Sequence, residues 1–178
     1  MTSAPRSRGT GSFEEFVHAT GPRLYRTAYL LCGDHHLAED LTQATYAKVF
    51  ASWRRVRRSD NPVAYTRAVL TRTWLSHRRL RRTSEQPSAQ LPELPERRAA
   101  DTDPAERLDL LDALAQLRPD DRTVLVLRFY EDLGFSQVAD LLGITEATAR
   151  KRCGRALERM RAQLPTLDLA HDTSGELR

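Results

Sequence analysis

Apolar residues recur every three or four positions through most of residues 13–82 and 105–164, and polar residues fill the positions between them. This spacing gathers the apolar side chains on one stripe of an α-helix, which can then pack against other helices. Nearly every periodic stretch has this helical period rather than the two-residue period of a strand. The pattern therefore predicts an all-α protein.

Capping and helix-breaking residues divide the first half of the chain into helices. Ser12 and Glu15 match a capping box at the start of the first helix, and Gly21-Pro22 interrupts or kinks it. Asp34 and Asn61 have side chains suited to cap later helices. The predicted helices cover residues 12–20, 22–32, 35–53 and 62–82, with a basic loop over 54–59.

The apolar stripes of these helices, and of those in the second half, define the expected core. The strongest stripe in the first half runs from Leu37 to about Trp53. Several apolar residues on or beside the stripes are expected to pack in the core, among them Phe50, Val63, Leu80, Ala115 and Phe129.

Residues 83–104 break the periodicity with prolines, polar residues and acids, a composition that disfavours a stable helix. We therefore expect a flexible linker between two small helical domains, at residues 12–82 and 105–164. Residues 1–11 and 165–178 also lack apolar periodicity, and we expect a disordered arm and a frayed tail there.

The stretch from Phe135 to Met160 has the pattern of a helix-turn-helix. Ser136 is expected to cap a short first helix, and Gly143 to supply the positive φ that a tight turn needs. Thr145 is a suitable N-cap for the second helix. That helix is expected to bury a stripe of small and apolar residues, namely Ala149, Cys153, Ala156 and Met160.

The outward face of that second helix is basic. It carries Arg150, Lys151 and Arg155, and DNA-binding helix-turn-helix units lay such a helix in the major groove. The alternative is an ordinary helical hairpin with a solvated basic face. That alternative requires both the position of Gly143 and the run of basic residues to be coincidences.

The formal net charge of +4 understates how unevenly charge is distributed. Residues 54–82 hold ten arginines against the single acid Asp60, whereas the predicted linker is acidic. Such segregation favours a polyanion as partner. The same stretch contains Tyr65 and Trp74, and rings that stack on unpaired bases beside arginines that track phosphates suit single-stranded or melting DNA. The alternative is that both rings belong to the core.

Cys32 and Cys153 fall on apolar stripes without a neighbouring His or Cys pair, so we expect buried thiols in a reducing compartment rather than a zinc site. The pair His35-His36 has no third ligand within reach by sequence, which argues against a metal. The sequence shows no signal peptide, no apolar run near twenty residues and no nucleophile–base pair. We therefore expect a cytoplasmic protein that is not an enzyme, uses no cofactor and does not contact a membrane.

Three separated motifs resemble bacterial RNA polymerase sigma factors of the extracytoplasmic function (ECF) group, in the SigE-type branch of the sigma-70 family. They are AEDLTQ at 38–43, NPVAY at 61–65, and LGI at 142–144 with ARKR at 149–152. The resemblance implies region 2 and region 4 helical domains joined by a flexible linker. It also implies a promoter-specificity subunit that binds core polymerase, recognises the −35 and −10 elements and directs transcription initiation.

The resemblance assigns roles to individual residues. Contacts to the β′ clamp helices of the polymerase fall to Glu39, Asp40, Leu41 and Gln43. The residues alone would mark the polar face of this helix as solvated and place Leu41 on its buried stripe. The residues assigned to opening and holding the −10 element are Asn61, Tyr65, Arg67, Arg72, Trp74, Arg78 and Arg79. A flipped base would lie near Asn61 and Tyr65. Contacts to the −35 element fall to Arg122, Thr145, Glu146, Thr148, Arg150, Lys151, Arg152 and Arg155.

The resemblance also implies contacts with the β flap of the polymerase and a path for the linker through the polymerase cleft, and it raises an anti-sigma factor as a further partner. Three residues depart from the family pattern: Ala44 replaces a common carboxylate, Arg72 replaces Asn, and Gly154 replaces a side chain that helps read the −35 element.

Two rival functions remain open. One is a one-component regulator that binds a palindromic duplex site without polymerase, and the other is an interaction protein whose basic helix binds RNA. Neither rival explains why a base-stacking helix and a duplex reader occur on one chain.

Overall fold

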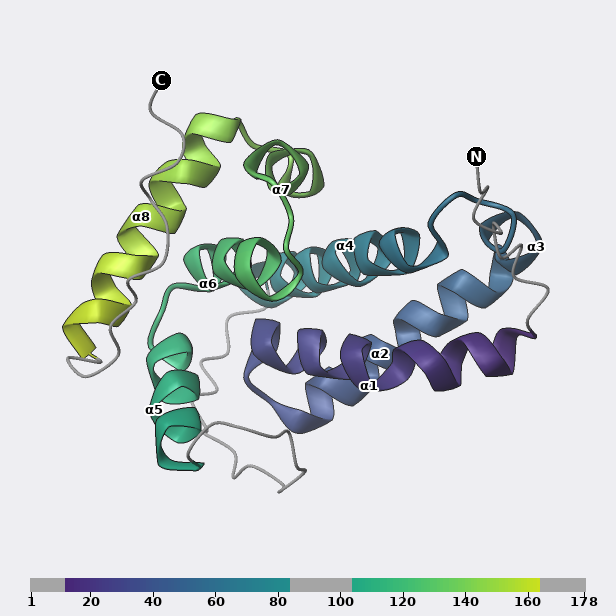
Figure 1. The fold of residues 1–178 in the computed structure, drawn as a ribbon, viewed down its shortest axis with the longest axis horizontal. Coiled ribbons are helices and arrows are strands. Elements are labelled where there is room, and N and C mark those ends of the chain that lie inside the picture. Colours follow the sequence, from purple (N-terminus) through teal and green to yellow (C-terminus); the bar gives the residue numbers. More distant parts are fainter. Residues whose placement is uncertain (1–11, 84–103, 164–178) are drawn as a thin grey trace, which may run out of the picture. The chain divides into compact units, whose positions relative to one another are not determined.

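The computed structural model describes residues 12–83 and 104–163, and all regular structure in these residues is helical (Figure 1). The prediction of an all-α protein is therefore confirmed for this part of the chain. The chain divides into two compact units, with the boundary between Glu93 and Leu94. The predicted arm and tail lie outside the described residues, as does the predicted linker apart from its two end residues.

The described part of unit 1 consists of α1 (Phe13–Cys32), α2 (His35–Ala51), α3 (Trp53–Val56) and α4 (Pro62–Thr83). Helices α1, α2 and α4 pack on one another, and each contributes one apolar stripe to a shared core. The core is built mainly from Leu24, Ala28, Leu31, Ala38, Leu41, Val49, Val56, Leu70 and Trp74.

The predicted caps of unit 1 form. The Ser12 hydroxyl accepts the N–H of Glu15 at 3.2 Å, and the Glu15 carboxylate accepts the N–H of Ser12 at 3.0 Å. Gly33 ends α1 in the left-handed conformation with φ 72°. The side chains of Asp34 and Asn61 accept backbone N–H bonds at 2.7 and 2.9 Å in the first turns of α2 and α4. These bonds satisfy donors that helix ends otherwise leave unpaired.

Two helix boundaries differ from the prediction. The sequence predicts an interruption or a kink at Gly21-Pro22, and the interruption is wrong because α1 continues through Pro22. An internal proline costs a helix about 3 kcal/mol, but burial of Leu24 and Leu31 beyond it contributes about 1.5–3 kcal/mol for each side chain. The basic segment after α2 is also not simply a loop, because α3 forms a short turn there and buries Val56.

Buried threonines take several core positions in unit 1. The hydroxyl groups of Thr27, Thr45, Thr66 and Thr71 donate to carbonyl oxygens one turn earlier, at 3.0, 2.7, 2.9 and 3.0 Å. A hydroxyl satisfied within its own helix can be buried without the penalty of an unpaired polar group. Thr45 lies on the predicted buried stripe of α2, whereas the other three threonines fill core positions that apolar spacing alone does not predict.

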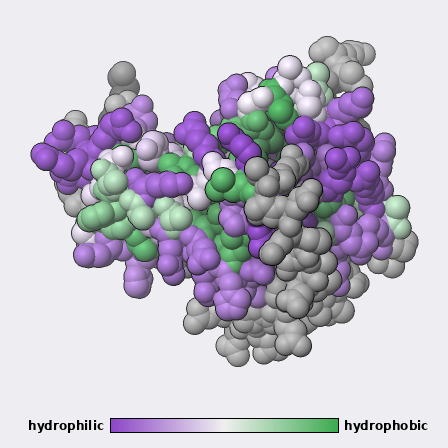
Figure 2. Space-filling model, turned by 180° about the vertical axis from the view of Figure 1, so that it is seen from behind, coloured by the Kyte–Doolittle hydropathy of each residue, from purple (hydrophilic) through white to green (hydrophobic). Residues whose placement is uncertain are grey.

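Some apolar residues expected in the core lie at the surface instead. Phe50, Val63, Leu80, Phe129 and Ala115 are exposed, so the prediction that they are buried is wrong. A residue at the edge of an apolar stripe faces solvent wherever no neighbouring helix covers it. Figure 2 shows one face of the molecule. Hydrophilic residues dominate this face, and hydrophobic residues are exposed in patches among them.

The described part of unit 2 consists of α5 (Pro104–Ala115), α6 (Pro119–Leu125), the π-helical turn η1 (Val126–Tyr130), α7 (Phe135–Leu142) and α8 (Glu146–Gln163). Helix α8 packs against α5, α6 and α7. A separate core results, built mainly from Ala113, Leu117, Val124, Leu127, Val138, Ala149, Cys153, Ala156 and Met160.

The connection from α6 to α7 begins with a π-helical turn rather than a continuation of the α-helix. The N–H of Glu131 donates to the Val126 carbonyl at 3.0 Å, the longer spacing of a π-helical turn. Asp132 then adopts a positive φ of 51°. The cap of α7 is Gly134 rather than Ser136, because the Gly134 N–H donates to the side chain of Gln137 at 2.9 Å.

Candidate functional site

Helices α7 and α8 form the predicted helix-turn-helix. Gly143 ends α7 with φ 63° and ψ 39°, and its N–H donates to the Ala139 carbonyl. The N–H of Ile144 donates to the same carbonyl at 3.1 Å. The Thr145 hydroxyl accepts the N–H of Thr148 at 3.2 Å, so it caps α8 as expected. This geometry confirms the turn that the position of Gly143 predicts.

Helix α8 turns its small residues inward. Ala149, Cys153, Ala156 and Met160 are all buried, as predicted, and burial raises the pKa of the Cys153 thiol. The predicted DNA-contacting residues therefore lie on the other side of the helix or at its edges. Glu146, Arg150, Lys151 and Arg155 are exposed, whereas Thr148 and Arg152 are half-buried.

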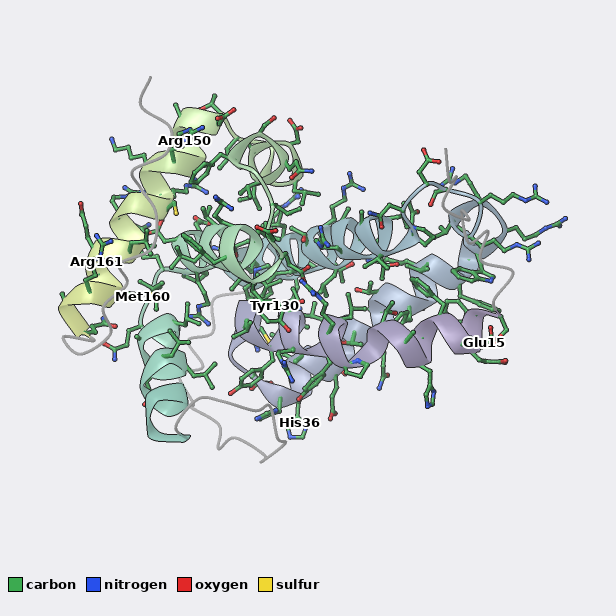
Figure 3. All side chains as sticks on the ribbon, in the orientation of Figure 1. Glu15, His36, Tyr130, Arg150, Met160 and Arg161 are labelled. Carbon is green, nitrogen blue, oxygen red and sulfur yellow. The ribbon has the colours of Figure 1, made fainter. Side chains whose placement is uncertain are left out.

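Arg150 lies in the second turn of α8 (Figure 3), and two neighbouring residues hold its side chain. Its guanidinium donates to one oxygen of the Glu146 carboxylate at 2.7 and 3.1 Å. It also lies 4.6 Å from the centre of the Phe135 ring, at the start of α7. These contacts limit the conformations of an exposed side chain and leave it oriented before any ligand binds.

The sequence prediction missed Arg128, which belongs to the same cluster. Its guanidinium lies 5.4 Å from the Phe135 ring centre and 5.6 Å from that of Phe129. Arg128 lies in the π-helical turn, and this widened turn places it beside the helix-turn-helix. The local sequence does not predict such a turn. It adds a cation next to the exposed basic face of α8.

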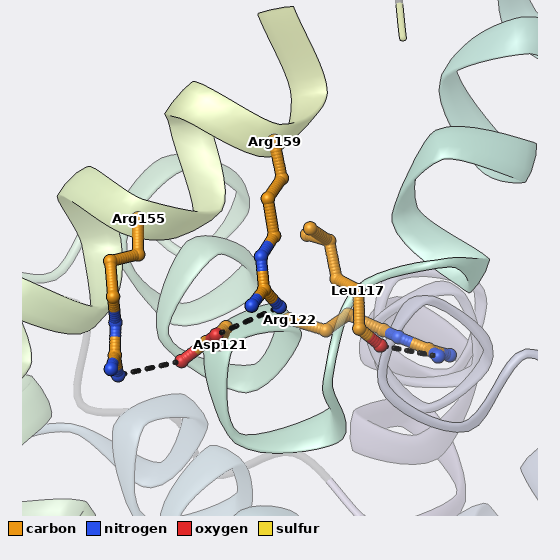
Figure 4. A network of polar contacts seen from close by, with 5 residues as sticks. All are labelled: Leu117, Asp121, Arg122, Arg155 and Arg159. Atoms are coloured by element: carbon orange, nitrogen blue, oxygen red, sulfur yellow. Dashed lines mark hydrogen bonds and ion pairs between the residues drawn. The ribbon is translucent and has the colours of Figure 1, made fainter. Parts of the chain in front are cut away.

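Arg122, which the resemblance assigns to the −35 element, bonds to backbone groups within unit 2. Its side chain is 9% exposed, and its Nη2 donates to the carbonyl oxygens of Ala115 and Leu117 at 2.9 and 3.5 Å (Figure 4). The guanidinium therefore serves the carboxyl end of α5, where a helix leaves carbonyls unpaired. Arg122 therefore has a structural role in unit 2, and the phosphate contact that the resemblance assigns to it stays a prediction.

Arg155 and Arg159 face an acid from another helix. Asp121, in the first turn of α6, places its Oδ1 at 3.5 Å from Nη2 of Arg155 and its Oδ2 at 3.8 Å from Nη1 of Arg159 (Figure 4). The Asp121 side chain is 3% exposed, whereas the two arginines are 49% and 47% exposed. The carboxylate thus lies behind α8 while the guanidinium groups reach the surface.

In unit 1, α4 presents most of the residues assigned to the −10 element. Asn61, Arg72 and Arg79 are exposed, and Tyr65, Arg67 and Arg78 are half-buried. Exposed arginines of α3 and the loop after it continue this basic surface, namely Arg54, Arg55, Arg57 and Arg58.

Trp74 is a core residue. It is 6% exposed, and the guanidinium of Arg78 lies 5.7 Å from its ring centre. A base needs an open ring face for stacking. The assignment of Trp74 to base stacking is therefore corrected, and the alternative that the sequence left open, a core position, holds for this residue.

The motif on α2 divides between two faces of the helix. Glu39, Asp40 and Gln43 are exposed, but Leu41 is 3% exposed and belongs to the core. Leu41 thus holds the core position that its apolar stripe predicts, and the polymerase contact that the resemblance assigns to it is corrected. Phe50 is 63% exposed and lies two turns beyond Gln43 on the same face, so it adds an apolar ring that the sequence prediction placed inside.

His77 on α4 is an electrostatic neighbour of Asp40. Burial lowers the pKa of His77, the Arg81 charge lowers it further, and the Asp40 charge raises it to a smaller extent. A lowered pKa keeps the imidazole neutral at neutral pH. His77 therefore offers the exposed Asp40 carboxylate no positive charge to pair with.

His35 has a structural role. Its Nδ1 lies 2.7 Å from the hydroxyl of Tyr25, and its ring stacks on Tyr29 with the centres 4.4 Å apart. Across residues 12–83 and 104–163, no group of three or more His, Cys, Asp or Glu side chains could hold a metal ion. In the same ranges, no helix combines the length and apolarity that crossing a membrane requires.

Comparisons with known proteins agree with this arrangement. Residues 16–84 match Sigma-70 region 2, and residues 107–160 match Sigma-70 region 4. The RNA polymerase sigma-E factor of Streptomyces coelicolor is 35% identical over 157 residues, which cover 88% of this chain and 88% of that protein. The RNA polymerase sigma factor CarQ of Myxococcus xanthus is 31% identical over 173 residues, covering 92% of this chain and 95% of CarQ.

Solved structures share the fold. The sigma factor RpoE from Bartonella quintana, in its complex with the anti-sigma factor NepR, superposes with a TM-score of 0.71 at 23% identity, covering 86% of this chain and 97% of RpoE. The extracytoplasmic function sigma factor SigJ of Mycobacterium tuberculosis gives 0.57 at 28% identity, covering 84% of this chain and 53% of SigJ.

The matched regions occur in the same order as the two compact units, and they account for both the α2 motif and the helix-turn-helix. The chain therefore belongs to the sigma-70 family of RNA polymerase sigma factors, in the extracytoplasmic function group. It is a promoter-specificity factor for transcription initiation.

Proposed function

We propose that unit 1 holds the chain on core RNA polymerase and opens the −10 element, while unit 2 locates the −35 element. The separation of two different exposed surfaces supports this division most directly. The α2 surface combines carboxylate, amide and aromatic side chains, and it lies in the unit that also carries the basic α4. The basic face of α8 lies in the other unit.

The α2 surface suits a protein partner. Asp40 and Gln43 offer a charge and a hydrogen-bonding amide, and Phe50 offers a ring that a pocket can bury. Aromatic anchors beside polar groups are typical of residues that dominate binding energy at interfaces. We propose that the clamp helices of the β′ subunit bind here.

The basic surface of unit 1 suits separated DNA strands. Asn61 and Tyr65 lie at the start of α4, where they can contact an extruded base, while Arg67, Arg72 and Arg79 track the phosphates. Extruding a base costs a few kcal/mol, and contacts with the flipped base recover that cost. Trp74 takes no part in this proposal because its ring is buried.

The basic face of α8 suits duplex DNA. Arg150 and Lys151 lie in the first half of the helix, the part that reaches base edges when such a helix enters the major groove. Arg152 and Arg155 complete this surface, with Thr145, Glu146 and Thr148 at the helix start. We propose that this surface binds the −35 element.

The chain works in the cytoplasm under this proposal, at the nucleoid while bound to polymerase, and it has no catalytic activity of its own. An anti-sigma factor is a further expected partner. The anti-sigma complex of RpoE shows such a partner for a protein of the same fold, and the α2 surface and the α8 surface are the two places where a partner would block function.

Run-off transcription with purified core polymerase tests the proposal. The template library carries randomised −35 and −10 elements, and we expect the chain to select a pair of elements and to start RNA synthesis only in the presence of core enzyme. The chain alone, mixed with the same library, should not enrich a palindromic site. Enrichment of such a site without polymerase, together with no selected transcription, would support the one-component regulator instead.

Two sets of variants separate the proposed roles. Asp40→Ala and Gln43→Ala should each weaken binding to core polymerase about tenfold, the loss that a central interface contact typically causes, while Glu14→Ala on α1 should leave it unchanged. Arg150→Ala and Lys151→Ala should instead reduce −35 selection at equal polymerase binding. Arg161→Ala, at the exposed end of α8, is the matched control for these two (Figure 3).

A further inference from the structure

Asp121 is a buried acid in the unit that carries the basic duplex-binding face. It is 2% exposed, at a position where α6 meets α8. A carboxylate repels phosphate and loses solvation when it is buried, so its presence here needs compensating interactions. The compensation comes from Arg155 and Arg159, which both reach it from α8 (Figure 4).

The two arginines lie one helical turn apart on α8, a spacing at which like charges repel each other. Each oxygen of the Asp121 carboxylate meets a different guanidinium, at 3.5 Å for Arg155 and 3.8 Å for Arg159. The acid therefore offsets the repulsion and restricts the conformations of both side chains. Because the arginines remain about half exposed, the rest of each guanidinium can still bind a ligand in solution.

The position of Asp121 in the first turn of α6 explains only part of this arrangement. Acids there interact favourably with the positive end of the helix dipole. Asp120 lies in the same turn and supplies the same effect. The helix dipole does not explain why Asp121 is buried against two cations of α8. Asp120 carries the same charge in the same turn, so a substitution of Asp120 is a matched control for one of Asp121.

We propose that Asp121 is a positioning residue for duplex recognition, which orients Arg155 from behind α8 and cancels part of the positive charge on the recognition surface. This inference rests on the proposed binding of the −35 element by α8. An oriented Arg155 loses less conformational freedom on binding, which favours contacts in one geometry. Lower net charge weakens attraction to phosphates of any sequence, so the two effects together raise selectivity.

The main experiment compares Asp121→Asn with Asp120→Asn, which change the net charge of the chain equally. The full chain is titrated with a fluorescent duplex of scrambled sequence over a range of salt concentrations. For Asp121→Asn we expect tighter binding and a log–log salt slope steeper by about one, the slope change for one additional phosphate contact. Asp120→Asn should leave the slope unchanged.

Holoenzyme assembled from the same variants measures selectivity on a promoter selected by the unchanged chain and on templates with single changes in its −35 element. Asp121→Asn should lower the discrimination between them about fivefold, a typical size for coupling between contacting residues. In an Arg155→Gln background, Asp121→Asn should lower discrimination by much less than fivefold, because only the charge effect through Arg159 remains. An equal loss in both backgrounds would overturn the positioning role.

Thermal unfolding of each variant checks that unit 2 remains folded. If Asp121→Asn unfolds it, Arg159→Gln tests the same idea, because the carboxylate is then left to Arg155 alone. Discrimination should then rise about twofold over Arg161→Gln, which removes the same charge, within the range of coupling between neighbouring side chains. A fall would overturn the inference. Failure of the unchanged holoenzyme to select any −35 element would contradict the proposed function instead.

Discussion

Gly143 and Gly154 show how one residue type meets different demands within the helix-turn-helix. Gly143 has φ 63°, and a Cβ built there would meet no atom within 4 Å. The backbone angle, rather than space, therefore requires glycine at the turn. Gly154 lies inside α8, and a Cβ there would also meet nothing within 4 Å. Neither angle nor space requires glycine at that position.

Alanine at these two positions should change stability in opposite directions. Gly143→Ala should lower the free energy of unfolding of unit 2 by about 1–2 kcal/mol, the strain of a left-handed L-residue. Gly154→Ala should raise it by about 0.5–1 kcal/mol, because glycine loses more backbone entropy in a helix. Thermal unfolding followed by circular dichroism measures both. If both variants shifted the free energy of unfolding in the same direction, the backbone angle would not be what distinguishes Gly143 from Gly154.

Helix α2 carries two separable functions within one short motif. Leu41 packs into the core of unit 1, while its neighbours Asp40 and Gln43 point to solvent. The helical repeat turns adjacent residues by 100° from each other, so one motif can serve both the fold and an interface. Family resemblance marks the whole motif as one unit and cannot assign its members to these two faces.

Substitutions within this motif should therefore split into two groups. Leu41→Ala should lower the free energy of unfolding of unit 1 by about 2–5 kcal/mol, as for other buried leucines. Asp40→Ala and Gln43→Ala should change it by less than about 0.5 kcal/mol, as surface substitutions do, although polymerase binding weakens. Denaturant unfolding and a binding titration on the same preparations check this. The division of faces fails if the surface variants lose as much stability as Leu41→Ala.

The sequence predicts mainly those features of the helices that depend on residues close together in the chain. The caps at Ser12 and Asp34 and the turn at Gly143 depend on a few adjacent residues, and all three form as expected. The burial of Trp74 and the exposure of Phe50 depend on which helix lies opposite, and apolar spacing on one helix does not contain that information.

The candidate site shows the same limit. The exposed face of α8 follows from its buried stripe of small residues, so Arg150 and Lys151 could be placed outward from sequence. Arg122 has the same chemistry but bonds to carbonyls at the end of α5. Arg128 reaches the site through a π-helical turn. Both outcomes depend on contacts between helices.

At the scale of the whole molecule, each unit has its own core and its own proposed ligand. The core of unit 1 is closed by α1, α2 and α4, and the core of unit 2 by α5, α6, α7 and α8. Neither set of helices needs the other to bury its apolar stripe. We therefore expect each unit to fold alone, and we expect residues 84–103 to matter for initiation because they tie the two units together.

Separating the units should preserve binding and abolish promoter-directed initiation. Residues 12–83 alone should bind core polymerase, and residues 104–163 alone should fold and bind duplex DNA weakly. Mixed at micromolar concentration, they should initiate at least about 100-fold less than the intact chain, because a short tether gives an effective concentration in the millimolar range. Run-off transcription and circular dichroism measure these properties.

Lengthening the connection provides the control for this experiment. A Gly/Ser insertion that doubles residues 84–103 should reduce initiation only about threefold, since doubling the length of a flexible loop costs about 0.6 kcal/mol. The tether explanation predicts this contrast between cutting and lengthening. If the insertion abolishes initiation as fully as separation does, residues 84–103 make contacts of their own in the initiating complex, and connection alone does not account for their role.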